Sequence, residues 1–198
     1  MSRVPPRLVL ATANAGKARE LRALVEAWGG DVLVQSLGDH AAVALPAETG
    51  ATYEANAATK AAVVAAATGL PALADDSGLE VDALGGAPGI RSARYGRDDA
   101  DRIARVLRAL EGRPDVERTA RFRCVVVLAW PDGRMAAGEG VVEGRIAIAP
   151  RGTGGFGYDP IFIADEVGET FAEAPAAEKA RVSHRARAMA ALGAVLGA

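Results

Sequence analysis

Apolar positions along the first third of the chain alternate between short runs and helical spacing, which predicts strands and helices in turn. Residues 7–12 are typical of a strand, and apolar residues recur at helical spacing from Leu21 to Trp28, ahead of Gly29-Gly30. A second strand is expected over residues 31–36, and an alanine-rich helix over residues 52–68. This order predicts β-α units at the start of the chain.

The rest of the chain continues the alternation and adds a hairpin. Residues 71–78 predict a short strand that ends in a polar turn, and residues 99–112 predict a helix that stops at Gly112. Residues 122–130 form strand readily, residues 131–133 form a turn, and residues 135–148 predict the returning antiparallel strand. A last helix buries Met189, Leu192 and Leu196. Together these elements predict an α/β protein with a mixed sheet.

Composition narrows the class of protein. The chain has 198 residues, half of them apolar, which suffices for one domain or two small lobes with a sizeable core. A formal net charge of −2 gives no support for binding a nucleic acid polymer. The single cysteine, Cys124, lies in an apolar run, which excludes an internal disulfide and fits a reducing compartment. No long apolar segment follows the first residues, so we expect neither a signal peptide nor a membrane anchor, and a cytoplasmic location.

Asp75 and Asp76 lie where a short apolar run meets polar residues. Burying an unpaired carboxylate is costly, so two acids at a strand end suggest a metal ion or proton transfer. The alternative is an Asp-Ser-Gly turn with both acids in water, because these residues are also common turn formers.

The segment of residues 12–17, Thr-Ala-Asn-Ala-Gly-Lys, joins the first strand to the first helix. Small residues leave backbone amides open there, and a helix start favours an anion such as phosphate. Thr12 and Asn14 are equally typical helix caps, so a structural role stays open. The segment lacks the Walker A pattern, which disfavours the P-loop enzymes.

Three further polar groups have both a chemical and a structural interpretation. Asn56 and Lys60 share one face of the alanine-rich helix. They either line a cleft or form the solvated stripe of that helix. The glycine-rich segment of residues 152–160 places two aromatic residues where they could stack on a flat ring, or builds an ordinary tight connection. Lys179 and Ser183-His184-Arg185 bring basic groups to the start of the final helix, where an anion would be favourable.

The inventory of charged residues favours a site for a metal ion and phosphates. Lysines and an arginine supply cations, while Glu48, Asp75 and Asp76 supply oxygen ligands that suit Mg²⁺. Two histidines and one buried cysteine disfavour zinc. A Ser-His-Asp mechanism is disfavoured because no G-x-S-x-G segment is present.

In order along the chain, these segments resemble the inosine triphosphate pyrophosphatase family and, within it, its bacterial dITP/XTP branch. The resemblance covers nearly the whole chain. Its markers are LATANAGK at 10–17, ETG at 48–50, Asn56 with Lys60, ADDSGL at 74–79, GGAPGI at 85–90, SARY at 92–95, GGFGYDP at 154–160 and SHR at 183–185.

The resemblance implies one ITPase-like domain over residues 1–198, with an elongated mixed sheet, helices on both sides, and two lobes around a substrate cleft without a separable linker. It also implies a homodimer and Mg²⁺-dependent cleavage of a small-molecule nucleoside triphosphate, a deaminated purine, to monophosphate and pyrophosphate. By matching motifs, Asp76 would be the general base, and Glu48, Asp75 and Asp76 would hold the metal. Substrate contacts would come from Thr12, Ala13, Asn14, Ala15, Gly16, Lys17, Lys60, Ser77, Phe156, Gly157, Tyr158, Asp159, Lys179, His184 and Arg185.

Two other functions stay open at this level. A related pyrophosphatase could act on other nucleotides, such as modified pyrimidines, because the phosphate and metal groups would serve any base. A nucleotide-binding module without catalysis would keep the lysines and glycine loops but would not need the carboxylates.

Overall fold

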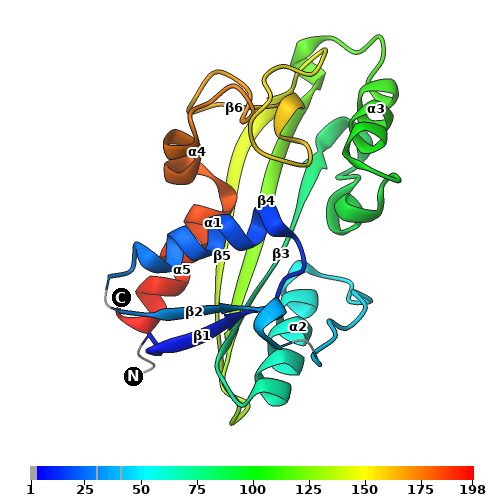
Figure 1. Ribbon diagram of the computed structural model, residues 1–198. Helices are drawn as coiled ribbons and strands as arrows, with labels where there is room; N and C mark the ends of the chain where they lie inside the picture. The colour runs from blue at the N-terminus through cyan, green and yellow to red at the C-terminus, as the bar shows by residue number, and fades with distance from the viewer. Residues whose placement is uncertain (1–3, 30, 41) are drawn as a thin grey trace. The chain divides into compact units, whose positions relative to one another are not determined.

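Six strands of the described chain form one mixed sheet, in the order β2-β1-β3-β4-β5-β6 (Figure 1). The computed structural model describes residues 4–29, 31–40 and 42–198, so the expectations for residues 1–3 and Gly30 lie outside it. β1 pairs in parallel with β2 and β3, whereas β5 and β6 are antiparallel, which confirms the predicted α/β class and mixed sheet. The strands are β1 Arg7–Leu10, β2 Leu33–Ser36, β3 Ala72–Val81, β4 Thr119–Ala129, β5 Met135–Ile146 and β6 Phe162–Ala164.

The helices begin and end at residues that suit those positions. In the alanine-rich helix, the Thr52 hydroxyl accepts a hydrogen bond from the Ala55 N–H, and Gly69 ends the helix at a φ of 66°. No helix of the described chain is long and apolar enough to cross a membrane. The α-helices are α1 Ala15–Glu26, α2 Tyr53–Thr68, α3 Asp99–Ala109, α4 Ala176–Val182 and α5 His184–Leu196, and the 3₁₀ turns are Leu37–His40, Asp82–Leu84, Gly89–Arg94, Asp115–Glu117 and Asp159–Ile161.

The predicted polar turn at the two aspartates is wrong. β3 continues through Asp75 and Asp76 to Val81, and both aspartates are buried. β1 ends at Leu10, opposite Leu73, so the aspartates lie beyond the carboxyl end of the neighbouring strand. Because positive and amide side chains surround them there, the acids stay in the strand without facing water.

The predicted final helix is two helices. Pro175 precedes α4, and Ser183 takes an extended backbone with a ψ of 155°, which separates α4 from α5. Lys179 therefore lies in α4, whereas His184 and Arg185 begin α5.

The chain divides into two compact units, each built from several segments. The first comprises Met1–Asp76, Cys124–Gly140 and Arg185–Ala198, and the second comprises Ser77–Arg123 and Val141–His184. The boundaries fall inside β3, β4 and β5 and between His184 and Arg185, so these strands run from one unit into the other.

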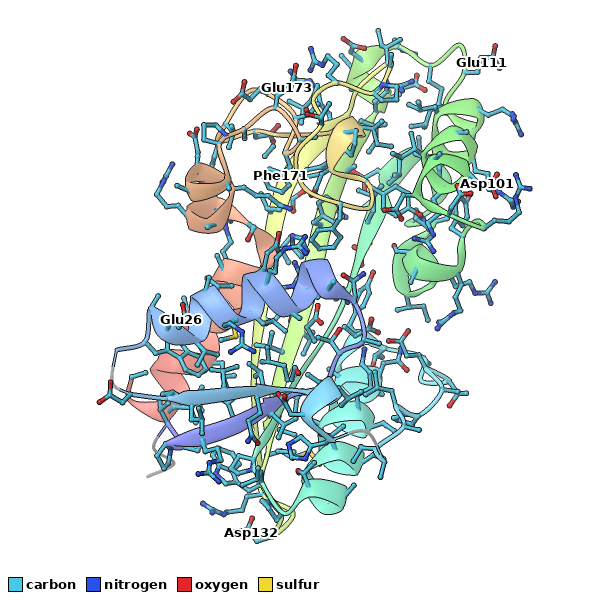
Figure 2. The ribbon with its side chains drawn as sticks, viewed as in Figure 1. Glu26, Asp101, Glu111, Asp132, Phe171 and Glu173 are labelled. Atoms are coloured by element: carbon cyan, nitrogen blue, oxygen red, sulfur yellow. The ribbon has the colours of Figure 1, made fainter. Side chains whose placement is uncertain are left out.

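Each unit has its own apolar core. In the first, α1 and α5 pack with β1, β3 and β4 through residues that include Leu21, Met189, Leu8, Leu73 and Val126. α5 lies directly on β5, because a Cβ at Gly138 would come within 2.3 Å of the Ala188 carbonyl oxygen. In the second, the core centres on three aromatic rings with centroids 4.6 to 6.2 Å apart, and one of them, Phe171, lies inside the unit in Figure 2. These rings are Phe122, Phe162 and Phe171.

Candidate functional site

The segment of residues 12–17 follows the carboxyl end of β1 and begins α1. The Asn14 side-chain oxygen accepts a hydrogen bond from the Lys17 N–H at 3.0 Å, so Asn14 is the N-cap of α1. The Thr12 hydroxyl accepts a hydrogen bond from the Asn14 N–H at 3.2 Å. The capping role that the sequence left open is therefore confirmed for Asn14, while Ala13, Asn14 and Ala15 are exposed and leave the helix start open to an anion.

Asp75 lies buried between cations from both ends of the chain. Its Oδ2 is 3.0 Å from the Lys17 Nζ and 3.1 Å from an Arg185 guanidinium nitrogen. Burial acts to raise the pKa of Asp75, but Lys17, Arg185 and Lys60 outweigh it and hold that pKa well below its usual range. Asp75 is thus an ionised group that organises the cations of the first unit.

Asp76 has a different environment. Its Oδ2 accepts a hydrogen bond from the Asn56 Nδ2 at 2.8 Å, and the residue is 4 % exposed. Burial raises the pKa of Asp76 above its ordinary value, and the Asn56 hydrogen bond and Lys60 oppose that shift in part. Neighbouring carboxylates with such different proton affinities suit different tasks, and Asp76 is the stronger base of the two.

Glu48 and Lys60 form an ion pair next to Asp76. The Lys60 Nζ lies 2.5 Å from the Glu48 Oε1, and the Glu48 charge contributes to the raised pKa of Asp76. Asn56 is 2 % exposed and Lys60 is 6 % exposed. The interpretation of these two residues as a solvated stripe of α2 is therefore wrong.

The donor set of the first unit fits a hard divalent cation that shares its ligands with a substrate. Among residues 4–29, 31–40 and 42–198, no group of three or more His, Cys, Asp or Glu side chains is arranged to hold a metal ion by itself. Asp75 pairs with two cations, whereas Glu48 pairs with one and Asp76 accepts from an amide, so Glu48 and Asp76 are better placed than Asp75 for such an ion. One or two carboxylates completed by water and phosphate oxygens are typical of Mg²⁺ sites. Direct coordination by Asp75 stays a prediction.

In the second unit, the predicted base-binding segment forms a small polar network. The Asp159 Oδ2 accepts hydrogen bonds from the Phe156 N–H at 2.8 Å and from the Lys179 Nζ at 2.5 Å. The Lys179 Nζ also lies over the Phe156 ring, 4.9 Å from its centroid. Gly155 is required here, because its φ is 71° and a Cβ would lie 2.0 Å from the Asp159 Oδ2. The structure thus unites Phe156, Asp159 and Lys179.

Tyr158 does not share the half-buried position of Phe156. Its ring belongs to the core of the second unit, and its hydroxyl donates a hydrogen bond to the Ser92 carbonyl oxygen at 3.0 Å. The idea that both aromatics of this segment stack on a ligand is therefore wrong for Tyr158. The preceding residue, Gly157, also makes a structural contact, because its N–H donates a hydrogen bond to the Asp99 carboxylate at 2.9 Å.

The remaining predicted residues divide between the units. His184 stacks on Phe122 in the second unit, with ring centroids 4.7 Å apart, and half-buried Ser77 belongs to the same unit. Arg185 belongs to the first unit, where it binds Asp75 and Glu20. Its observed role is to pair with Asp75, and its predicted contact with a base stays a prediction.

The catalytic, substrate and metal residues implied by the resemblance do not include Asn56, whose side chain is hydrogen-bonded to Asp76 in the structure. The signal was present in the spacing of Asn56 and Lys60 on one helical face, but nothing in the sequence states which acid the amide would contact. Glu20, which binds Arg185, is also absent from that list and carries no recognisable motif.

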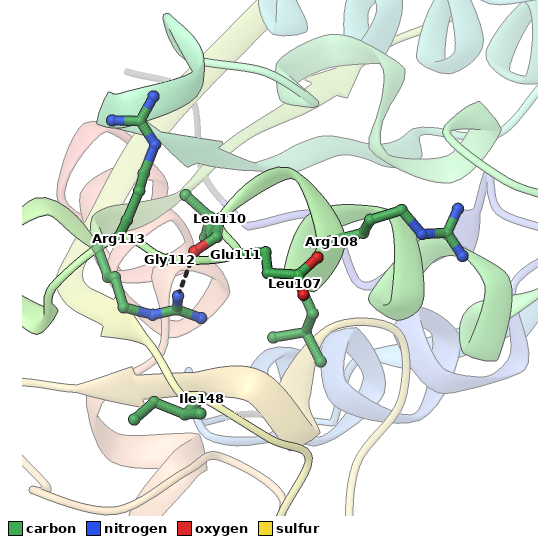
Figure 3. A pocket seen from close by; sticks show the side chains of 8 residues that line it. Leu107, Arg108, Leu110, Glu111, Gly112, Arg113 and Ile148 are labelled. Carbon is green, nitrogen blue, oxygen red and sulfur yellow. Dashed lines mark hydrogen bonds between the residues drawn. The ribbon is translucent and has the colours of Figure 1, made fainter.

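Two cavities lie away from these residues, in the second unit. One, of about 340 Å³, lies at the end of α3 and includes Leu107, Leu110 and Ile148 (Figure 3). The buried Arg118 on its wall donates to the carbonyl oxygens of Leu110, Ile146 and Ala147 at 2.8 to 2.9 Å, which satisfies the helix end. A second, of about 360 Å³, shares Ile148. None of the predicted site residues lines either cavity.

Comparisons with known proteins agree on one family. The model of the Ham1 family matches residues 8–195. The chain is 56% identical over 191 residues to the dITP/XTP pyrophosphatase of Thermus thermophilus, covering 94% of this chain and 89% of that protein. It is 49% identical over 192 residues to the dITP/XTP pyrophosphatase of Deinococcus radiodurans, covering 97% and 94%.

Solved structures give the same result. The HAM1 protein of Coxiella burnetii superposes with a TM-score of 0.85 at 42% identity, covering 96% of this chain and 98% of that one. The Ham1 protein of Staphylococcus aureus gives a TM-score of 0.83 at 36% identity, with the same coverage.

Proposed function

Because the chain belongs to the Ham1 family, we propose that it hydrolyses non-canonical purine nucleoside triphosphates, namely ITP, dITP and XTP, to the nucleoside monophosphate and pyrophosphate. The observation that carries the proposal is the pair of contrasted carboxylates, Asp75 held by cations and Asp76 held by an amide, beside an open helix start. The names of the curated relatives supply the substrate class.

The start of α1 and the lysines would bind the triphosphate. The first N–H groups of α1, at Ala15 and Gly16, carry the positive end of the helix dipole, and Lys17 and Lys60 add charges beside the carboxylates. Both lysines are paired with acids in this structure, so they are oriented before a phosphate arrives. Such preorganised charge stabilises the charge that develops on the phosphate oxygens in the transition state.

Asp76 would accept the proton of the attacking water. The water oxygen forms a bond to the α-phosphorus, pyrophosphate leaves with the electrons of the broken phosphoanhydride bond, and the proton passes to a carboxylate oxygen of Asp76. Burial raises the pKa of Asp76, which makes it a better proton acceptor than an aspartate in water.

Mg²⁺ would be held by Glu48 and Asp76, with phosphate oxygens and water completing its ligands. Bound there, it would neutralise charge on the phosphates during the displacement. Asp75 would support the site by fixing Lys17 and Arg185.

The second unit would recognise the base. Phe156 offers a ring for stacking, with Lys179 already on one of its faces, so a purine would stack on the other face. Inosine and xanthosine carry an acceptor at position 6, where adenosine carries an amino donor. A pocket that donates hydrogen bonds to position 6 would leave those donors unpaired against adenine, which would strongly disfavour ATP as a substrate.

Incubation of the purified protein with Mg²⁺ and, separately, ITP, XTP, GTP, ATP and dTTP tests the proposal, with both pyrophosphate and orthophosphate quantified. We expect pyrophosphate from ITP and XTP and little from ATP or dTTP. Orthophosphate as the product, or turnover of dTTP alone, would replace the proposal with a different phosphohydrolase. Nucleotide binding without turnover would indicate a binding module.

A further inference from the structure

We propose that Asn56 is a positioning residue that fixes Asp76 and the segment carrying Glu48 relative to each other, an inference that rests on the proposed function. Asn56 lies on α2, is 2 % exposed, and uses both ends of its amide. Its Nδ2 donates to the Asp76 Oδ2 at 2.8 Å, and its Oδ1 accepts from the Gly50 N–H at 2.8 Å.

The Gly50 contact determines which end of the amide faces Asp76. A backbone N–H can only donate, so the oxygen of the Asn56 amide must face Gly50 and its NH₂ group must face the carboxylate. Asp76 therefore always meets a donor on Oδ2, and rotation of its carboxylate about the Cβ–Cγ bond is opposed. The position of the second oxygen, Oδ1, is constrained by the same contact.

The same amide controls where Glu48 lies. Glu48 is two residues before Gly50, so a hydrogen bond to the Gly50 N–H also anchors the backbone that carries Glu48. One turn further along α2, Lys60 holds the Glu48 carboxylate itself. The two carboxylates proposed to share a metal ion thus depend on one helix face for their spacing.

Close packing leaves little room for this arrangement to change. A Cβ at Gly50 would lie 2.7 Å from the Asn56 Oδ1 and 3.0 Å from the Ala55 Cβ. Alanine at position 50 would therefore push the Asn56 amide out of place without removing any group proposed to touch the substrate. Gly50→Ala is a second, independent way to disturb the same contact.

Four variants test the proposal: Asn56→Ala, Gly50→Ala, the double variant, and Thr59→Ala as the matched control. Thr59 is exposed on the same helix and bonds to the Ala55 carbonyl oxygen, so its loss changes α2 without touching Asp76. For each variant, kcat and KM for ITP are measured well below the thermal midpoint of unfolding. Affinity for a methylene-bridged, non-hydrolysable ITP analogue is measured by calorimetry at several Mg²⁺ concentrations.

For Asn56→Ala, we expect kcat to fall about 10- to 100-fold, as for other residues that orient a catalytic group, with KM changed less than about threefold. More Mg²⁺ will be needed for half-maximal binding of the analogue. Gly50→Ala will lower kcat in the same direction, and adding it to Asn56→Ala will lower kcat less than about twofold further, because both act through one contact. Thr59→Ala will match the unmodified protein.

The proposal is overturned if folded Asn56→Ala keeps the kcat of the unmodified protein, or if the two single effects multiply in the double variant. A loss of activity that follows only the loss of folded protein would also overturn it, in favour of a purely structural Asn56. If the unmodified protein releases no pyrophosphate, the proposed function fails instead. In that case a crystal structure of Asn56→Ala tests the positioning role. A rotated Asp76 carboxylate would support it, and an unchanged one would overturn it.

Discussion

At Asp75, burial and positive charge act in opposite directions on one carboxyl group. Burial alone would favour the neutral acid, but Lys17 and Arg185 at about hydrogen-bond distance favour the ion more strongly. One residue along, Asp76 faces an amide and its pKa moves the other way. A single peptide bond thus separates two carboxylates suited to different roles, which gives separate predictions for stability and for chemistry.

The first prediction concerns the stability of the fold at acidic pH. The folded pKa of Asp75 lies below its unfolded value of about 3.9, so the ionised carboxylate stabilises the fold above about pH 4. That stabilisation is lost as the pH falls from there through the lower folded pKa. Urea unfolding between pH 7 and pH 3 should show the free energy of unfolding declining with acid in the unmodified protein, and declining less steeply in Asp75→Asn.

At neutral pH, Asp75→Asn should lower the free energy of unfolding by about 3 kcal/mol, because it leaves buried cations without their carboxylate. Asp31→Asn, which removes an exposed aspartate, is the charge-matched control. Equal stability of the two variants at pH 7 would contradict the role given to the Asp75 ion pairs.

The chemical prediction concerns Asp76→Asn. This change keeps the size of the side chain but removes the proton acceptor, so turnover of ITP should fall at least 100-fold, within the range of about 10²–10⁴ typical of a general base. Binding of the methylene-bridged analogue, measured by calorimetry at saturating Mg²⁺, should persist. An Asp76→Asn protein that still releases pyrophosphate at the original rate would remove Asp76 from the role of base.

Sequence patterns identified the types of residue at the site better than their partners. Lys60, Asp75 and Asp76 were recognisable because charged residues interrupt apolar or alanine-rich segments, whereas the role of Glu48 came from the family resemblance. Which cation meets which acid depends on tertiary packing, and no spacing rule brings Arg185 to Asp75 across 110 positions. For the same reason, the side chain of Tyr158 could not be assigned to the core from its glycine-rich surroundings.

At the scale of elements, β3 shows how packing overrides local preference. Asp-Asp-Ser-Gly favours a turn, yet β3 runs on to Val81, because buried side-chain partners satisfy the acids in the strand. The helices α1, α2 and α3 could be predicted closely, since caps and apolar spacing act locally. β6, with three residues, and the break between α4 and α5 were not predicted, because neither has a periodic pattern long enough to detect.

The contact between β5 and α5 gives a prediction at this scale. A Cβ at Gly138 would meet the Ala188 carbonyl oxygen at 2.3 Å and the Leu192 nitrogen at 2.4 Å, both backbone atoms that cannot rotate away. Gly138→Ala should therefore force α5 from the strand and lower the free energy of unfolding by at least about 1 to 3 kcal/mol. Chemical denaturation measures this, with Ala137→Val on the exposed side of the same strand as control. Unchanged stability of Gly138→Ala would show that the helix shifts at little cost.

At the scale of the whole molecule, the cations and acids of the first unit come from segments at both ends of the chain. The core of that unit likewise combines β1, β4 and α5. Family membership follows from this complete set of elements, since the Ham1 match extends from residue 8 to residue 195. The cytoplasmic location and the homodimer stay predictions.

The homodimer is testable by analytical ultracentrifugation. We expect a sedimenting mass of twice the chain mass of 20.3 kDa at micromolar concentration. A mass of one chain across the measured concentrations would remove the dimer from the description of this protein.

The pairing of Asp75 with Lys17 and Arg185 has a consequence for biosynthesis. A ribosome makes Lys17 and Lys60 long before Arg185, so the growing chain carries Asp75 without its Arg185 partner until α5 emerges. The first unit also lacks Met189 and Leu192 of its core until then. The first unit therefore completes its core and its buried ion pairs only after α5 has been made, and a chain interrupted before Arg185 should be a target for proteolysis.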